Sequence, residues 1–182
     1  RVNSRAMAPV LALLTLFWLA EPAPVKGVPA PPGGRFEPEM TKVVSDRAKV
    51  EMQSVLAELE RSAQPPEAKA EIRRRLAGLR LAVYTTPRGW EETVAFYEGA
   101  PMQLVFLKGE RDILGDLREW ARSTGVGVDA SAEKAWAGKS GRTARWTKDD
   151  DTLQVVVEDH LIDPRDGKVS ETTVVLVTSL GG

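Results

Sequence analysis

Apolar residues recur with helical spacing at the start of the folded part of the chain. Between Met40 and Leu59 they fall at steps of three and four, with charged residues between them, which is typical of an amphipathic helix. The pair Pro65-Pro66 ends this helix, and Pro66 suits the first turn of a second helix that finishes near Gly78. Two helices are therefore expected before the first strand.

The remaining pattern predicts a β-α-β-α unit and then strands alone. In order we expect a strand over 81–87, a helix over 90–98, a strand over 102–107, a helix over 112–123 and a loop over 124–130. After Gly141 the apolar period changes to two, in segments rich in Val and Thr over 143–147, 152–161 and 169–179. They predict a three-stranded antiparallel meander, with a turn at 163–167. The whole order predicts an α+β fold with helices covering one sheet face.

An uncharged apolar run over residues 6–20 precedes the folded part. Arg1 and Arg5 come before it and Glu21 follows it, which is the layout of a secretory signal. A helix of this length spans about 22 Å, short of a ~30 Å hydrocarbon core, but it can extend at both ends. We expect a signal-anchor or transmembrane helix over residues 1–20, with a cleaved signal peptide as the alternative.

The candidate cleavage positions favour retention of this segment. Signal cleavage needs small residues at the first and third positions before the cut. A cut after Ala20 places Trp18 at the third position, and a cut after Ala23 places Glu21 there. The positive-inside rule puts the basic amino end in the cytoplasm. The expected location is the bacterial inner membrane, single-pass, with the carboxyl-terminal domain in the periplasm.

Residues 21–38 hold six of the 12 prolines. This composition favours extended polyproline II over helix or core packing. At about 3.1 Å per residue, the segment is long enough to hold a domain some 40–50 Å from an anchor, or to lie as a strap along a protein surface. A mature amino-terminal tail has the same composition. We therefore divide the chain into an anchor over 1–20, a linker over 21–38 and a periplasmic domain over 39–182.

The composition limits the chemistry of the 182-residue chain. It has no cysteine and one histidine, His160, which excludes thiol nucleophiles, disulfides and iron–sulfur ligation, as well as a multi-histidine metal site within one chain. A formal net charge of -1 lacks the basic surplus typical of nucleic-acid binding. We expect no cofactor, no metal and no nucleic-acid partner.

Several short motifs suggest binding sites but have plainer interpretations. Residues 138–140, Gly-Lys-Ser, resemble the end of a phosphate loop, yet Glu133 stands where its first glycine is required, and a strand is expected to follow. The aspartates at 149–151 suit a solvated turn better than a calcium loop. His160 beside Asp159 is expected to be a strand-end residue, because no nucleophile motif accompanies it.

Tryptophan is frequent relative to tyrosine, with five residues against two. Trp90 and Trp120 fall on apolar helix faces, whereas Trp136 lies in a glycine-flanked polar loop. An exposed tryptophan is typical of interfaces, but a loop folded back over the core would bury the same ring. The candidate interface residues are Leu13, Leu16, Phe17 and Trp18 in the apolar run and Trp136 in the domain.

One stretch of about 15 residues resembles a known unit. Val83-Tyr84-Thr85-Thr86 precedes a helix that carries Val94, Phe96 and Tyr97. This arrangement is similar to a strand-turn-helix unit of small secreted or membrane-attached bacterial domains of uncharacterised function. The resemblance implies a packing role, in which the helix folds onto the strand, and it carries no catalytic residue over. The long segment 99–141 before the meander departs from it.

These observations favour a non-catalytic, membrane-anchored accessory or structural subunit of a larger bacterial inner-membrane complex. Its expected partners are integral membrane subunits and the lipid bilayer. Respiratory or photosynthetic assemblies are candidate hosts, and no residue selects between them. The alternative is a secreted periplasmic domain that binds a small ligand or a protein after signal cleavage. A hydrolase using Glu91, Glu92 or Asp159 has no spacing in its favour.

Overall fold

The computed structural model describes residue 25 and residues 27–100, 105–147 and 153–181. The expected anchor over 1–20, with Leu13, Leu16, Phe17 and Trp18, lies outside the described residues, as do the aspartates at 149–151. Within the part of the chain that is described, none of the helices combines the length and the apolar character that a bilayer crossing requires.

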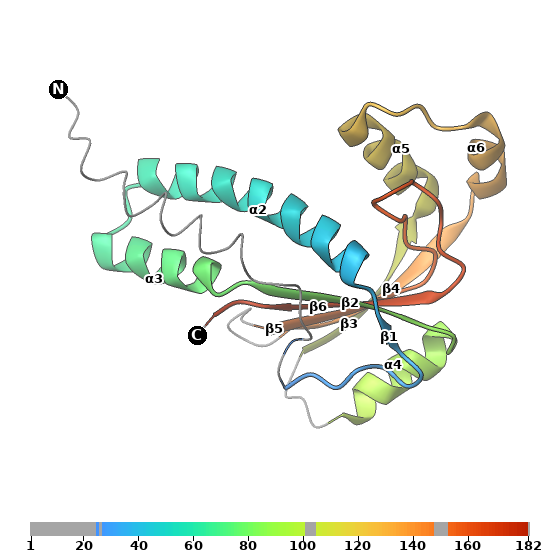
Figure 1. Cartoon of the computed structure of the whole chain (residues 1–182), viewed down its shortest axis with the longest axis horizontal. Helices are drawn as coiled ribbons and strands as arrows, with labels where there is room; N and C mark the ends of the chain where they lie inside the picture. Colours follow the sequence, from blue (N-terminus) through green and yellow to red (C-terminus); the bar gives the residue numbers. More distant parts are fainter. Residues whose placement is uncertain (1–24, 26, 101–104, 148–152, 182) are drawn as a thin grey trace.

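The described residues form an α+β fold, as the periodicity predicts (Figure 1). Its helices are α2 (Pro38–Arg61), α3 (Pro66–Ala77), α4 (Trp90–Gly99), α5 (Ile113–Thr124) and α6 (Ala130–Trp136). Its strands are β1 (Arg35–Phe36), β2 (Arg80–Thr86), β3 (Val105–Asp112), β4 (Ser140–Thr147), β5 (Leu153–Glu158) and β6 (Thr173–Ser179). The short elements β1 and α6 were not expected from the sequence, and Trp136 ends a helix instead of lying in a loop.

The strands form one antiparallel sheet in the order β1-β2-β6-β5-β4-β3. The expected meander is present as β4, β5 and β6, and β3 extends it by one strand. Strand β2 pairs with β6 along its whole length, from Arg80 opposite Ser179 to Thr86 opposite Thr173. The strands that flank α4 therefore lie far apart in the sheet, β2 near one edge and β3 at the other.

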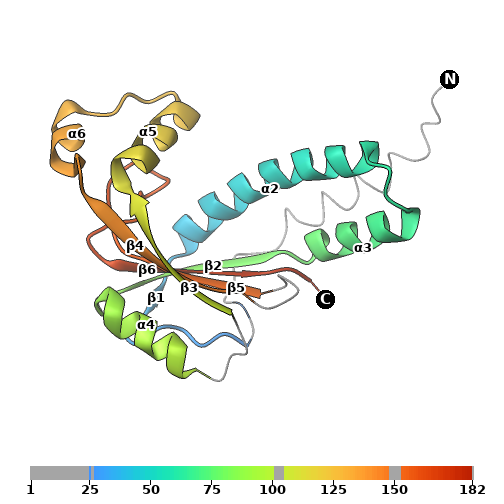
Figure 2. The same cartoon turned by 180° about the vertical axis from the view of Figure 1, so that it is seen from behind.

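Helices lie on both faces of the sheet, so the expectation of one covered face is wrong (Figures 1 and 2). The α4 side buries Val94, Tyr97, Val155, Val157, Val175 and Val177. The α2 side buries Met40, Val83 and Val174. The physical reason is that β5 and β6 carry continuous apolar runs, and a strand with apolar residues on both faces needs cover on both.

The proline-rich segment lies against the domain from Val25 onward. Val25 is buried in the α4-side core. The Tyr97 hydroxyl donates to the carbonyl oxygen of Pro29 (2.9 Å), and Thr86 Oγ1 donates to that of Pro32 (2.7 Å). The segment then pairs with β2 as β1. The described part of the segment is therefore a strap fastened to the sheet and to α4.

The start of α2 closes the outer edge of β2. The Val83 N–H donates to Thr41 Oγ1 (2.9 Å), and the Val83 carbonyl accepts from the Glu37 N–H (2.9 Å). Thr41 is fully buried. Its hydroxyl oxygen takes the place of the backbone carbonyl of a neighbouring strand, which the buried Val83 N–H would otherwise need as its acceptor. The contact fixes where α2 begins relative to the sheet.

Candidate binding cleft

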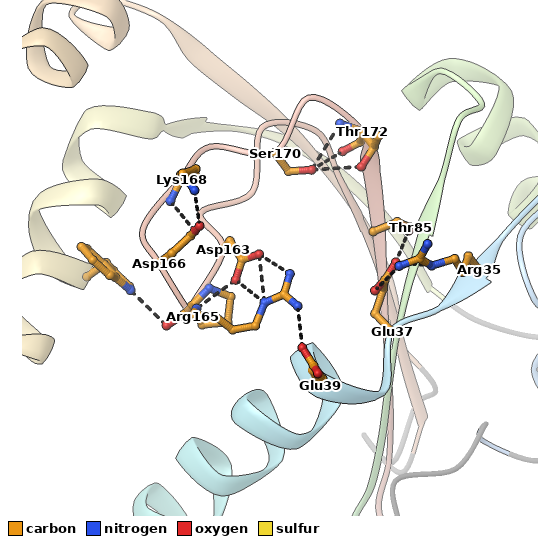
Figure 3. Close-up of polar contacts among 12 residues, drawn as sticks. Arg35, Glu37, Glu39, Thr85, Asp163, Arg165, Asp166, Lys168, Ser170 and Thr172 are labelled. Atoms are coloured by element: carbon orange, nitrogen blue, oxygen red, sulfur yellow. Dashed lines mark hydrogen bonds and ion pairs between the residues drawn. The ribbon is translucent and has the colours of Figure 1, made fainter.

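A cleft of about 610 Å³ lies at one end of the sheet. Its two sides are the β1–α2 junction and the loop that joins β5 to β6, as Figure 3 shows. The lining is mostly charged and hydroxyl side chains, among them Arg35, Glu37, Thr85, Thr86, Asp163, Arg165, Asp166, Lys168, Ser170 and Thr172. These residues come from segments up to 137 positions apart, Arg35 to Thr172, so only the fold brings them together.

The loop side of the cleft is a closed turn, as the sequence at 163–167 predicts. The Gly167 N–H donates to the Asp163 carbonyl (2.8 Å), and the Asp163 N–H donates to that of Lys168 (2.7 Å). Trp120 of α5 supports the turn by donating from Nε1 to the Pro164 carbonyl (3.3 Å). Gly167 has a φ of 73°, and a Cβ there would lie 2.4 Å from the Trp120 ring. Glycine is therefore required for both backbone conformation and space.

The central ion pair of the cleft joins Asp163 to Arg165. Arg165 Nη2 and Nε lie 2.5 and 2.9 Å from the Asp163 carboxylate, and the Arg165 backbone N–H also donates to it (2.9 Å). The guanidinium lowers the pKa of Asp163 below its ordinary 3.8 and has its own pKa raised in return. Arg165 Nη1 also lies 3.5 Å from Glu39 in the first turn of α2. The pair thus links the loop to the opposite side of the cleft.

The remaining charges of the cleft are paired along its sides. Glu37 accepts from Thr85 Oγ1 (2.7 Å) and lies 3.1 Å from Arg35 Nε. On the loop, Lys168 Nζ lies 2.7 Å from Asp166, and this bond lowers the pKa of the carboxyl. Arg35 and Lys168 have side chains that are 80% and 83% exposed, so either cation can change partners at little cost.

This chemistry suits binding better than proton transfer. A general base that works near neutral pH needs a pKa close to 7, whereas the pKa values of Asp163 and Asp166 are lowered from 3.8. Exchangeable ion pairs and hydroxyl groups instead match a polar, charged segment of a partner chain. Among the described residues, no group of three or more metal-ligating side chains is in position to hold a metal ion.

A second, smaller hollow of about 220 Å³ lies between α2 and the sheet. Its lining is mainly apolar, with Val44, Val156, Leu161 and Leu176 among its residues. Glu158 lies at its edge, and burial raises the pKa of that carboxyl although Arg111 opposes the shift.

The Glu158 carboxylate already has protein partners on the sheet. Arg111 Nη1 lies 3.1 Å from it, and Thr143 Oγ1 donates to it (3.3 Å). The same arginine also binds Asp116 of α5 at 2.6 Å. This half-buried carboxylate has a structural role, because it holds Arg111, which in turn ties α5 to the sheet.

Trp136 is half-buried and does not line the cleft. It packs with Trp120, Ala132 and Val169 on the small core formed by α5, α6 and the β5–β6 loop. Its ring centroid lies 5.4 Å from that of His160, and Lys139 Nζ lies 5.0 Å above it. The Trp136 ring therefore packs against the β5–β6 loop from outside the cleft that this loop lines.

His160 lies at the end of β5, as expected, in a left-handed conformation with φ of 54°. Its Nδ1 lies 3.4 Å from Asp159, whose carboxylate also accepts from Arg142 Nε at 2.6 Å. The Arg142 guanidinium lies 4.8 Å above the Trp90 ring and also pairs with Glu91. Asp159 and Glu91, two of the carboxylates considered for hydrolysis, are thus held by one arginine.

Comparisons with protein-family models, curated proteins and solved structures gave no match for this chain. The likeness of Val83 to Tyr97 to small bacterial domains therefore stays a prediction. The cleft residues were not predicted as a site from the sequence. Their one local signal was the turn at 163–167, and its charged residues are typical of any solvated turn.

Proposed function

We propose that this chain is a non-catalytic accessory subunit of a bacterial inner-membrane complex. In this proposal residues 1–20 anchor it, the domain lies in the periplasm, and the polar cleft binds a charged segment of a partner subunit. Respiratory and photosynthetic assemblies stay candidate hosts.

The fastened strap is the observation that carries the proposal. Val25 is buried in the core and Pro29 and Pro32 are hydrogen-bonded to the domain. Five residue steps separate Ala20 from Val25, which an extended chain covers in about 17 Å. A domain anchored through residues 1–20 is therefore held close to the membrane, not 40–50 Å away. That position suits a subunit that binds the periplasmic surface of its membrane partners.

The cleft supplies a second argument. Its cations Arg35 and Lys168 are exposed and its hydroxyl groups lie along both sides, so a partner segment can form charge-assisted hydrogen bonds there. The cleft carries three cations and three carboxylates in its lining, Arg35, Arg165 and Lys168 with Glu37, Asp163 and Asp166. A partner segment of mixed charge fits this balance better than an anionic polymer.

Mass spectrometry of the native protein tests the proposal. We expect the mature chain to retain residues 1–20 and to be extracted from membranes by detergent together with a larger partner. A mature amino end at or beyond Pro24 contradicts the anchored subunit. Migration at the 19.9 kDa of the chain alone after mild extraction contradicts a stable subunit role.

The alternative is a secreted binding domain released by signal cleavage. The strap is compatible with this alternative, because a cut before Val25 leaves every described strap contact in place. The same mass measurement separates the two functions, since the secreted domain starts near residue 24 and is found in the soluble periplasmic fraction.

A further inference from the structure

Helix α3 and the residues that flank it form a basic cluster. Residues 60–80 hold six cations and three carboxylates, a surplus of three positive charges, whereas the whole chain has a formal net charge of -1. The cations of the basic cluster are Arg61, Lys69, Arg73, Arg74, Arg75 and Arg80. Positive charge is therefore concentrated in one short part of the chain.

Two carboxylates serve three of these arginines. Arg73 pairs with Glu60 at the end of α2. Arg74 and Arg75 share the carboxylate of Glu71. All three arginine side chains are more than a third exposed, and exposed ion pairs exchange partners at little cost. These arginines are therefore able to turn toward an anionic surface.

The other three cations donate to the backbone. For Arg61, Lys69 and Arg80 the described partners are carbonyl oxygens, those of Ala57, Glu60 and Leu79, at 3.0, 2.9 and 3.0 Å. A carbonyl group is a dipole without net charge, so these hydrogen bonds hold the side chains in place without neutralising them. The surplus positive charge of the basic cluster therefore remains.

Helix α3 has the residue pattern of a helix that lies on a surface. None of the residues of α3 is buried, and Ile72 and Leu76 are partly exposed. These two residues are four positions apart and so share one side of the helix, and Lys69 and Arg75 fall on either side of them. An apolar line between cations is typical of helices that lie in the headgroup region of a bilayer.

The basic cluster and the polar cleft lie at opposite ends of two elements. Met40 in the first turn of α2 lines the cleft, and Glu60, 20 positions further along α2, pairs with Arg73, so about 30 Å of helix separates them. Strand β2 likewise runs from Arg80 to Thr86, which lines the cleft. Figures 1 and 2 show α3 at the end of the molecule away from α5 and α6. A surface bound at the basic cluster therefore leaves the cleft accessible.

We propose that the basic cluster binds the anionic phospholipid headgroups of a bilayer surface. Each Lys or Arg near such a surface strengthens binding severalfold. Cations that point to several sides of one short helix, on exposed side chains, suit mobile headgroups better than the fixed acceptors of a protein. The domain then contacts the membrane through α3 and directs its polar cleft away from it. This contact is additional to the anchor proposed over residues 1–20 and does not require it.

A probe on α3 tests the contact. Ala70 of α3 and Ala135 of α6 are both exposed, and the chain has no cysteine, so the full chain with Ala70→Cys or Ala135→Cys takes one fluorophore. Vesicles of phosphatidylcholine alone are compared with vesicles of phosphatidylcholine and phosphatidylglycerol in equal parts, both containing a headgroup-quencher lipid. Quenching at position 70 should be about twofold stronger or more with phosphatidylglycerol and should fall at high salt. Position 135 should change little.

The two vesicle types separate this proposal from the anchor. Equal quenching at position 70 in both overturns the lipid contact, whether or not the chain is bound to the vesicles. Sedimentation with phosphatidylcholine vesicles tests the anchor alone. A chain that stays in solution with these vesicles, yet is quenched at position 70 by phosphatidylglycerol, supports the basic contact and contradicts the anchor.

Removal of charge tests the residues. Arg74→Gln with Arg75→Gln should weaken the phosphatidylglycerol-dependent contact roughly tenfold. Arg118→Gln with Arg122→Gln on α5 is the matched control, because both arginines are exposed, Arg118 also pairs with a glutamate, Glu133, and the change in net charge is the same. The control should bind as the unmodified chain does. Circular dichroism confirms that the variants are folded, and an equal loss in both double variants overturns the assignment to the basic cluster.

Discussion

Asp163 holds the loop side of the cleft through one carboxylate. It accepts from the Arg165 backbone N–H and from the Arg165 guanidinium, and its side chain is only 15% exposed. Hydrogen bonds to a charged, partly buried group contribute more than those of exposed pairs. Asp166, two-fifths exposed and paired with Lys168, is a nearby carboxylate of lower expected contribution.

We expect Asp163→Asn to lower the free energy of unfolding by about 1–3 kcal/mol at pH 7. The folded pKa of Asp163 is below the ordinary 3.8, so its contribution is complete above pH 3.8 and is lost as pH falls through the folded pKa. Urea unfolding followed by tryptophan fluorescence from pH 7 to pH 3 measures this. Asp166→Asn should cost less than about 1 kcal/mol. A pH-independent loss in Asp163→Asn would show that the ion pair is not its cause.

The junction between α2 and β2 is the element-scale contact that seals one sheet edge. Thr41 Oγ1 accepts from the buried Val83 N–H. Thr93 of α4 is equally buried, but its hydroxyl donates to the Gly89 carbonyl, which also accepts from the Thr93 N–H. Loss of the two hydroxyl groups therefore has different consequences, because only the first leaves a buried backbone donor without a partner.

Thr41→Val should lower the free energy of unfolding by about 1–3 kcal/mol and speed hydrogen exchange at the Val83 amide. Thr93→Val is the matched control, with an expected cost below about 1 kcal/mol, because the Gly89 carbonyl keeps its backbone donor. Chemical denaturation and amide exchange by NMR measure the two effects. Unchanged exchange at Val83 in Thr41→Val would contradict the sealing role of α2.

At the scale of the whole molecule, the strap would determine how the domain is placed on a membrane if the proposed anchor over residues 1–20 holds it there. It runs along the α4 side and into β1, whereas α6 lies on the other side of the sheet (Figures 1 and 2). In an anchored chain the strap should therefore lie closer to the bilayer than α6 does. Ala30 in the strap and Ala135 in α6 are both exposed, so each accepts a probe.

Single cysteines at these two positions report the distance to the bilayer. The full chain carrying Ala30→Cys or Ala135→Cys is labelled with a fluorophore and reconstituted into vesicles that contain a headgroup-quencher lipid. We expect strong quenching at position 30 and weak quenching at position 135. Equal quenching at both positions would contradict close attachment through the strap. The unlabelled chain in the same vesicles controls for changes in the intrinsic tryptophan fluorescence.

Local periodicity predicted most elements because it records which side of an element is buried. The helices α2 to α5 and the strands β2, β4, β5 and β6 fall where spacing placed them, with ends shifted by up to about four residues. Strand β3 shares only residues 105–107 with the strand expected over 102–107 and continues to Asp112. The strand expected over 169–179 begins only at Thr173, because its first residues turn away to line the cleft. The elements β1 and α6 are two and seven residues long, too short for a periodic signal.

The sequence by itself determined most of the elements, the turn at 163–167 and the lack of thiol chemistry, since these depend on neighbouring residues and on composition. Tertiary structure alone decided the pairing of β2 with β6, the fastening of the strap and the cleft. Each of these depends on contacts between residues far apart in the chain. The apolar face of a helix or strand shows that its residues are buried, but only the tertiary fold determines which residues pack against them.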